Sequence, residues 1–228
     1  MKSSPLNSIG SAHFSSGEQE HQPQRSPGGR VCVFFASKEG HTQEIARRIA
    51  LDLHKHGFDV DLHNVRMPFP FHLSDYSAAI LAASVHQGNH EPEMIQFVKG
   101  HRAELDRMPT AFLSVTLSEA GAEMKGRTAA DHEQFVADVK QMLETFFKQT
   151  GWHPTTVKPV AGALLYSKYN FLIRFLMKRI ARKAGASTDA SRDYDYTDWI
   201  GLDRFVEEWG AEINAAQKTE SLASAKAG

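Results

Sequence analysis

The fold is decided by the stretch Val31-Cys32-Val33-Phe34-Phe35 and the turn that follows it, Ser37-Lys38-Glu39-Gly40-His41-Thr42. A short, unbroken apolar run is typical of a strand that is buried on both faces of a parallel sheet. After the turn, Ile45, Ile49 and Leu53 recur at helical spacing, and Gly57 ends the predicted helix. A buried strand, a polar turn and an amphipathic helix together predict the start of an α/β fold.

The same alternation continues along the chain. Further strands are predicted at residues 60–65, 78–83, 110–117 and 156–165, and helices lie between them. Thr197 or Asp198 is expected to cap the last helix. The pattern predicts a doubly wound, five-stranded parallel sheet. Ligands of such sheets bind outside the carboxyl ends of the strands, so the loops after the first, third and fourth strands are the predicted site.

Composition excludes several classes of protein. The chain has 228 residues, with 26 Lys and Arg against 27 Asp and Glu, and this near-neutral balance argues against a nucleic-acid partner. Its longest uncharged apolar run, residues 78–85, is far shorter than the ~18 residues of a membrane helix. One cysteine excludes an internal disulfide framework, and no metal-ligand spacing among the histidines indicates a metal site.

Both ends are predicted to lie outside the folded part. Residues 1–29 are rich in Ser, Gly and Pro and lack apolar periodicity, so we expect a disordered extension. That extension lacks the apolar region of a secretory signal, while a mitochondrial presequence stays an alternative. Residues 217–228 are small and polar and are expected to form a disordered tail. The folded domain then spans residues 30–216.

The first predicted loop has the residue types of an anion site. Backbone amides of Ser37–Thr42, with a helix N-terminus behind them, can surround a phosphate, and Ser37 and Thr42 can add hydroxyl donors. Gly40 is expected to permit an amide-forward backbone that a Cβ would obstruct. Because neither GxxxxGK[ST] nor GxGxxG is present, a mononucleotide is favoured over a dinucleotide. The alternative is an ordinary turn with Thr42 as the N-cap.

Two more polar loops are predicted to meet this one at the same sheet edge. Their residue types suit contact with the two sides of a flat polar ring. The second loop comprises Ser84, Val85, His86, Gln87, Gly88, Asn89 and His90, and the third comprises Ser114, Val115, Thr116, Leu117 and Ser118.

With these loops the chain resembles the flavodoxin superfamily, whose members bind FMN with three such loops. Further motifs resemble the HemG-type protoporphyrinogen oxidase family over about residues 31–213. These are Met108-Pro109, Gly151-Trp152-His153-Pro154, Ala161-Gly162-Ala163-Leu164 and Tyr196-Thr197-Asp198-Trp199.

The resemblance implies a flavodoxin fold, FMN, and oxidation of protoporphyrinogen IX in haem biosynthesis, with electrons passed to menaquinone or ubiquinone. Carried over by position, Ser37–Thr42 would hold the phosphate, and the loops from Ser84 and Ser114 would flank the flavin ring. Bacterial members of the family are richer in Arg and Tyr in the second loop. Here His86 is a weak candidate for a proton acceptor, although a loop hydrogen bond is the commoner role of such a residue.

A long connection after the fifth strand is the most unusual segment. Residues 166–184 contain no acid, and at helical spacing their apolar residues share one broad arc. Such a basic amphipathic helix can lie on an anionic membrane, in keeping with a peripheral location on the cytoplasmic face of the inner membrane, or on the mitochondrial inner membrane. It could instead pack on the domain or bind porphyrin carboxylates. Its cations are Lys168, Arg174, Lys178, Arg179, Arg182 and Lys183.

Other functions stay open at this stage. A flavodoxin-like electron carrier or an NAD(P)H:quinone reductase would need no porphyrin substrate, and a binding module on the same sheet would need no flavin. The long basic segment argues against a simple carrier. Sequence alone leaves the oligomeric state undetermined, so a homo-oligomer is a further alternative.

Overall fold

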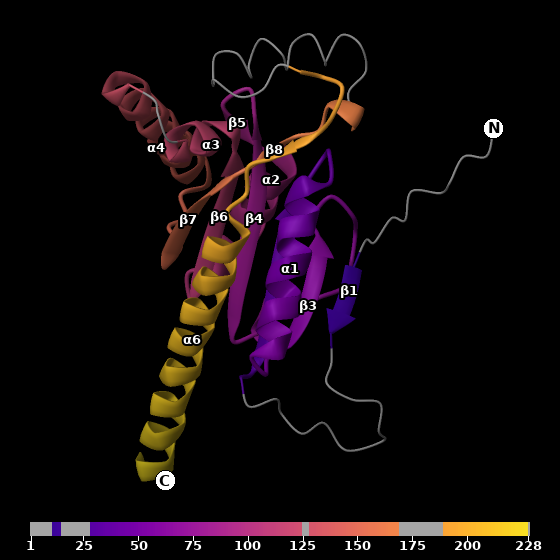
Figure 1. The fold of residues 1–228 in the computed structure, drawn as a ribbon. Coiled ribbons are helices and arrows are strands. Elements are labelled where there is room, and N and C mark those ends of the chain that lie inside the picture. Colours follow the sequence, from indigo (N-terminus) through magenta and orange to yellow (C-terminus); the bar gives the residue numbers. More distant parts are fainter. Residues whose placement is uncertain (1–10, 15–27, 125–127, 169–188, 228) are drawn as a thin grey trace, which may run out of the picture.

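The computed structural model describes residues 11–14, 28–124, 128–168 and 189–227. Its centre is a parallel sheet, flanked by helices (Figure 1). Five parallel strands confirm the predicted doubly wound, flavodoxin-like α/β fold. In spatial order they are β3 (Asp59–Asn64), β2 (Arg30–Ala36), β4 (Ala78–His86), β6 (Thr110–Thr116) and β7 (Thr156–Ala161).

Strand β2 has parallel partners on both sides. Val31 lies opposite Val60 of β3 and Ala78 of β4, and this register continues along the strand. Side chains of Val31 to Ala36 are almost completely buried, as the unbroken apolar run predicts.

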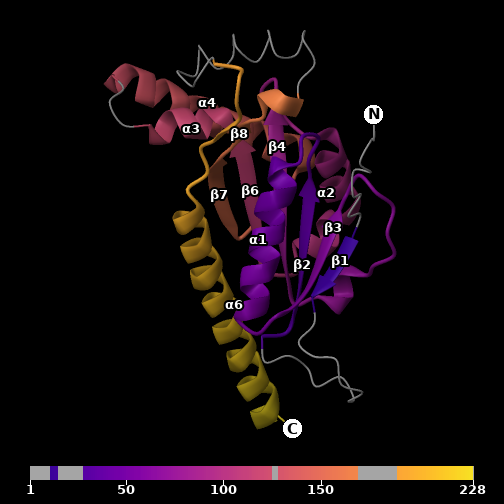
Figure 2. The ribbon, with the colours of Figure 1, turned by 45° about the vertical axis from the view of Figure 1, so that its right-hand side comes forward.

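Helices cover both faces of the sheet (Figure 2). Helices α1 (His41–Lys55) and α6 (Trp199–Ala227) pack on one face, against Val31, Val33 and Phe35. On the other face, α2 (Pro92–Leu105) and α4 (Ala129–Thr150) pack against Cys32 and Phe34. Successive residues of one strand therefore supply two separate cores, because strand side chains alternate between faces.

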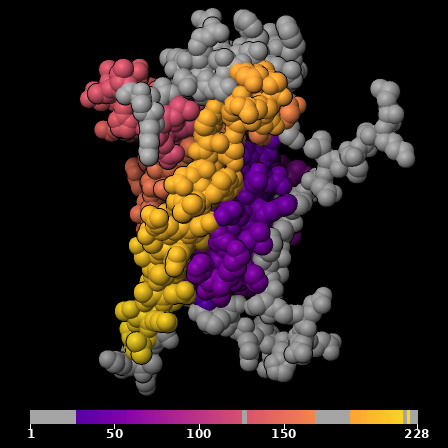
Figure 3. All heavy atoms as spheres, viewed as in Figure 1, coloured from indigo at the N-terminus to yellow at the C-terminus, as the bar shows by residue number. Residues whose placement is uncertain are grey.

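Helices α1 and α6 lie side by side on the outer surface (Figure 3). Arg48 of α1 donates two hydrogen bonds of 2.6 Å to the carboxylate of Asp203 in α6. The Arg48 guanidinium also stands 5.2 Å from the ring centroid of Trp199. These contacts fix where α6 begins, directly beside the N-terminal half of α1. Of the two predicted capping residues, Asp198 is the one that caps α6. Its Oδ1 accepts a hydrogen bond from the Gly201 backbone N–H at 2.9 Å.

The two ends of the chain contain more secondary structure than we predicted. Within residues 1–29, β1 (Ser11–Phe14) pairs antiparallel with β3, whose edge would otherwise offer unpaired backbone groups. Helix α6 continues to Ala227, through the range expected to form a disordered tail. Its Ala, Lys and Glu residues are strong helix formers, and this propensity outweighs the shortage of apolar residues.

Three further elements lie near the carboxyl ends of the strands. The predicted fifth strand, 156–165, is wrong beyond Ala161. There β7 ends, and β8 (Ala163–Leu164) pairs with β9 (Tyr194–Asp195) instead of the main sheet. A short helix that we did not predict, α3 (Leu117–Glu123), follows β6 directly. The predicted third loop is therefore the end of a strand and the start of a helix.

The 3-10 helix η2 (Tyr166–Lys168) follows β8, and η1 (Leu73–Asp75) precedes β4. Lys168 ends η2, whereas the other five predicted cations lie outside the described residues. Within the described residues, no helix combines the length and apolar character that a membrane crossing needs.

Candidate functional site

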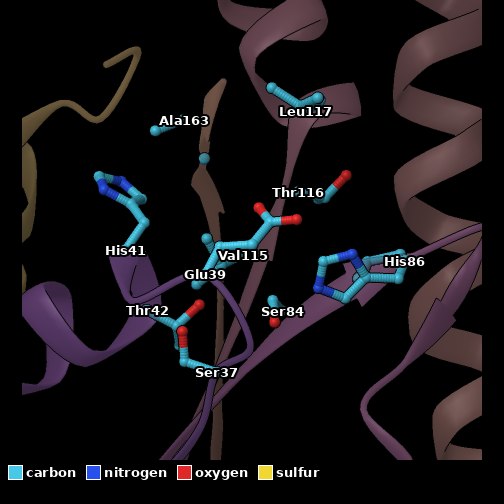
Figure 4. A pocket seen from close by; sticks show the side chains of 12 residues that line it. Ser37, Glu39, His41, Thr42, Ser84, His86, Val115, Thr116, Leu117 and Ala163 are labelled. Carbon is cyan, nitrogen blue, oxygen red and sulfur yellow. The ribbon is translucent and has the colours of Figure 1, made fainter. Parts of the chain in front are cut away.

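A pocket opens at the carboxyl ends of the parallel strands, where a doubly wound sheet binds its ligands. Four separate segments of the chain converge there, and Figure 4 shows His41 and His86 on opposite sides with Glu39 between them. The pocket is lined by Ser37, Glu39, His41, Thr42, Ser84, Val85, His86, Val115, Thr116, Leu117, Gly162 and Ala163.

The first wall is the turn between β2 and α1. Gly40 has φ +98° and occupies the N-cap position of α1, and its N–H donates to Ser37 Oγ at 3.0 Å. The first amides of α1 have no acceptor within the helix, and they add to the positive end of the helix dipole. This end of the pocket can therefore hold an anionic group.

One detail of the phosphate-site prediction and one of its alternative differ from the structure at this turn. Gly40, and not Thr42, takes the N-cap position. A Cβ built on Gly40 meets no atom within 4 Å, so space does not require glycine there. The requirement comes from the positive φ, which a residue with a Cβ adopts only at a cost.

The second wall is a tight hairpin, where we predicted an open loop. Strand β4 continues to His86, and β5 (Asn89–His90) returns beside it. Gln87 (φ 52°) and Gly88 (φ 80°) form the turn, and positive φ at both central residues is what a type I′ hairpin turn requires. Ser84, Val85 and His86 are thus held on a strand end.

A buried carboxylate, Glu91, follows this hairpin. Ser84 Oγ donates to Glu91 Oε1 at 3.1 Å, and His86 Nε2 lies 3.1 Å from the same oxygen. Burial alone would raise the pKa of Glu91, but interactions with His86 and Lys38 outweigh it and lower the pKa to about 2. The group is therefore ionised at neutral pH, and it was not among the predicted site residues.

The third wall comes from β6 and the start of α3. Thr116 Oγ1 accepts the Ser118 N–H at 2.9 Å and so caps α3. Two residues earlier in β6, Ser114 is fully buried, and its Oγ lies 2.9 Å from Nε2 of His90. Burial lowers the pKa of His90 to about 4, so this imidazole is neutral at pH 7.

The fourth wall links the pocket to the segment before α6. Gly162 and Ala163 line the pocket, and Thr197 Oγ1 donates to the Ala161 carbonyl at 2.8 Å. Because that donation uses the hydroxyl hydrogen, Oγ1 accepts from Nε2–H of His41, 2.8 Å away. Asp195 Oδ1 lies 3.5 Å from the same nitrogen.

Burial lowers the pKa of His41, although the Asp195 carboxylate opposes this effect. The Tyr196-Thr197-Asp198-Trp199 motif thereby contacts the first residue of α1.

The chain is similar in sequence to a known family and to several named proteins. Residues 32–191 match the family described as flavodoxin domain. A protoporphyrinogen IX dehydrogenase [quinone] from Leishmania major is 31% identical over 183 residues, which cover 80% of this chain and 75% of the relative. Its counterpart in Escherichia coli K12 is 29% identical over 179 residues, covering 78% of this chain and 93% of the relative.

This chain belongs to the flavodoxin domain family, within its HemG-type protoporphyrinogen oxidase group. Among solved structures, a flavodoxin from Streptococcus pneumonia TIGR4 aligns with a TM-score of 0.42 and 16% identity, over 82% of this chain and 99% of that chain. A flavodoxin from the domain Archaea aligns with a TM-score of 0.43 and 12% identity, over 83% of this chain and 99% of that chain.

The three predicted loops meet at one edge of the sheet, as the sequence predicts. Ten of their residues line the pocket, whereas the others stand beside it. The sequence analysis predicts three pocket walls and does not predict the fourth, Gly162–Ala163. These two residues lie within the family motif Ala161-Gly162-Ala163-Leu164. The loop residues that do not line the pocket are Lys38, Gly40, Gln87, Gly88, Asn89, His90, Ser114 and Ser118.

We predict that Thr197→Val lowers the free energy of unfolding by about 1–3 kcal/mol, measured by urea denaturation. The variant leaves the Ala161 carbonyl and the His41 N–H without their buried partner. Thr197→Ser keeps the hydroxyl and serves as the control. Equal stability of the Val and Ser variants would contradict the assigned hydrogen bonds.

A second prediction concerns pH and His90. Because the folded-state pKa is about 4, below the unfolded value of about 6.5, the unfolded chain takes up the proton first as pH falls. Stability should therefore decline between about pH 6.5 and pH 4, and His90→Gln should lessen that decline in thermal unfolding. His72→Gln is the control, because His72 is exposed. A decline of the same size in His90→Gln and the parent would refute this account.

Proposed function

We propose that this protein binds FMN and oxidises protoporphyrinogen IX to protoporphyrin IX, passing the electrons to a membrane quinone. The observation that carries the proposal is the convergence of four chain segments in one pocket beside the N-terminus of α1. The chain's relatives named protoporphyrinogen IX dehydrogenase [quinone] support the choice of substrate and acceptor.

The residues of the pocket fit FMN. The turn Ser37–Thr42 presents helix amides and hydroxyls to a phosphate, and Gly40 takes the positive φ of +98° that this turn requires. The ring would lie between the hairpin Ser84–Asn89 and the segment Ser114–Leu117, which face the pocket from neighbouring strands β4 and β6. Bound FMN would supply two-electron oxidation, in which it accepts a hydride equivalent.

Each two-electron step also releases a proton from the porphyrinogen, and we assign its acceptance to His86. Its Nε2 lies 3.1 Å from Glu91 Oε1, so we assign the proton to the other ring nitrogen, Nδ1. His86 is about one-third exposed at the pocket, so a substrate can reach it.

The decisive experiment is anaerobic mixing of the FMN-loaded protein with protoporphyrinogen IX. We expect the flavin absorbance near 450 nm to bleach and to return when ubiquinone or menaquinone analogues are added. Reduction by NAD(P)H without any reduction by the porphyrinogen would indicate a quinone reductase instead. Failure of both donors would indicate an electron carrier.

We predict that Gly40→Val weakens FMN binding by about tenfold or more, because a β-branched residue at φ +98° costs about 1–3 kcal/mol or shifts the turn. Gly57→Val is the matched control, since Gly57 has φ +87°, no atom near a built Cβ, and a place at the far end of α1. Titration of both apoproteins with FMN measures the difference. Unchanged affinity in Gly40→Val would remove the turn from the site.

We further propose that residues 166–184 attach the protein to an anionic membrane, where a lipid-soluble quinone reaches the pocket. The support is compositional, with six cations and no acid in this stretch. Its N-terminal end follows β8, beside the pocket. Attachment on the cytoplasmic face of the inner membrane, or on the mitochondrial inner membrane, would serve the same purpose.

Reversal of Arg174, Lys178 and Arg182 to Glu should abolish sedimentation with anionic liposomes, since each cation contributes about 1 kcal/mol near such a surface. Attachment of the parent should also weaken as salt rises. Neutral liposomes are the control. A triple variant that sediments like the parent would contradict membrane attachment. The alternative, binding of porphyrin carboxylates, would then be tested by measuring the KM of the variant for protoporphyrinogen.

A further inference from the structure

Glu91 is the most deeply buried charged side chain beside the pocket, with 0% of the side chain exposed. It stands at the N-cap position of α2, immediately after the hairpin Ser84–His90. It is not among the residues that line the pocket. A buried carboxylate is retained only when its partners compensate the lost hydration.

One carboxylate oxygen holds the hairpin. Oε1 accepts from Ser84 Oγ and approaches His86 Nε2, each at 3.1 Å. The Glu91 backbone N–H also donates to the Ser84 carbonyl at 3.1 Å. Two pocket-lining residues of β4 are therefore held by the N-cap residue of α2.

The other oxygen reaches the first loop and the segment after β3. Oε2 lies 3.1 Å from Lys38 Nζ and 3.8 Å from Arg66 Nη1. Lys38 belongs to the proposed phosphate turn, whereas Arg66 follows β3. A single buried charge thus joins the segments that leave three neighbouring strands of the sheet, β2, β3 and β4.

Stability alone gives a weak reason for such a group. Buried ion pairs are often replaced by apolar side chains without loss, because desolvation offsets the attraction. The carboxylate instead fixes the relative position of two segments. One of its oxygens contacts Lys38 and the other contacts the hairpin. Pockets that are organised before binding lose less affinity to the ordering of loops.

We propose that Glu91 is a positioning residue of the flavin site, which holds the ring-side hairpin and the phosphate turn in their binding arrangement. This inference rests on the proposed binding of FMN. It assigns to Glu91 no contact with the cofactor, and its effect passes through Ser84, His86 and Lys38.

The test compares Glu91→Gln with Glu93→Gln. Glu93 lies in the first turn of the same helix and contacts the same arginine, with Oε1 3.4 Å from Arg66 Nη2, but its side chain is 35% exposed. Each apoprotein is titrated with FMN and with riboflavin, which has the same ring but no phosphate. Visible circular dichroism of the saturated protein reports the ring environment.

We expect Glu91→Gln to weaken both FMN and riboflavin by about tenfold or more and to change the circular dichroism of the bound ring. Amide hydrogen exchange should accelerate in residues 84–90 of the same variant. Glu93→Gln should resemble the parent in every measurement. Should Glu91→Gln fail to fold, Glu91→Met supplies an apolar side chain of similar length for the same titrations.

Folded Glu91 variants that bind both flavins within about twofold of the parent, with unchanged circular dichroism, overturn the positioning role and leave FMN binding intact. A parent protein that binds neither flavin overturns the proposed function, and the positioning role with it. The two failures are thereby distinguished by the parent titration alone.

Discussion

Burial of β2 on both faces is the constraint from which the rest of the structure follows. A strand with parallel partners on both sides and helices above and below has no solvent-facing side, so every residue from Val31 to Ala36 must be apolar. The chain can become polar only where the strand ends. That point is Ser37, and the amides of α1 begin four residues later, at the same edge where β4 and β6 end.

The pocket at this edge is held by buried polar groups whose partners come from distant parts of the chain. His41 contacts Thr197, His90 contacts Ser114, and Glu91 joins Lys38 to the hairpin. Each contact connects two parts of the chain that lie at least 24 positions apart. Because an unpaired buried polar group is costly, these contacts favour one arrangement of the pocket over its alternatives.

The sequence predicted most of the candidate site because hydrophobic periodicity and the polar turn after each strand can be read from neighbouring residues. Apolar runs located the strands, and polar turns after them located three of the four pocket walls. Family motifs added the Ala161-Gly162-Ala163-Leu164 and Tyr196-Thr197-Asp198-Trp199 segments, without their geometry. Local signals failed for β1 and for the end of α6, since pairing at a sheet edge and the helix propensity of a polar stretch leave no apolar periodicity.

By itself, the sequence determined the α/β class, the alternation of strands and helices along the chain, and the position of the polar turn at Ser37–Thr42. These depend on hydrophobic period and on residue types at neighbouring positions. Only the tertiary structure decided that Glu91 is buried between Lys38, Ser84 and His86, and that Thr197 bonds to His41. Those contacts join residues up to 156 positions apart. Their strength depends on how deeply the groups are buried and on the geometry between distant residues, which no short stretch of sequence contains.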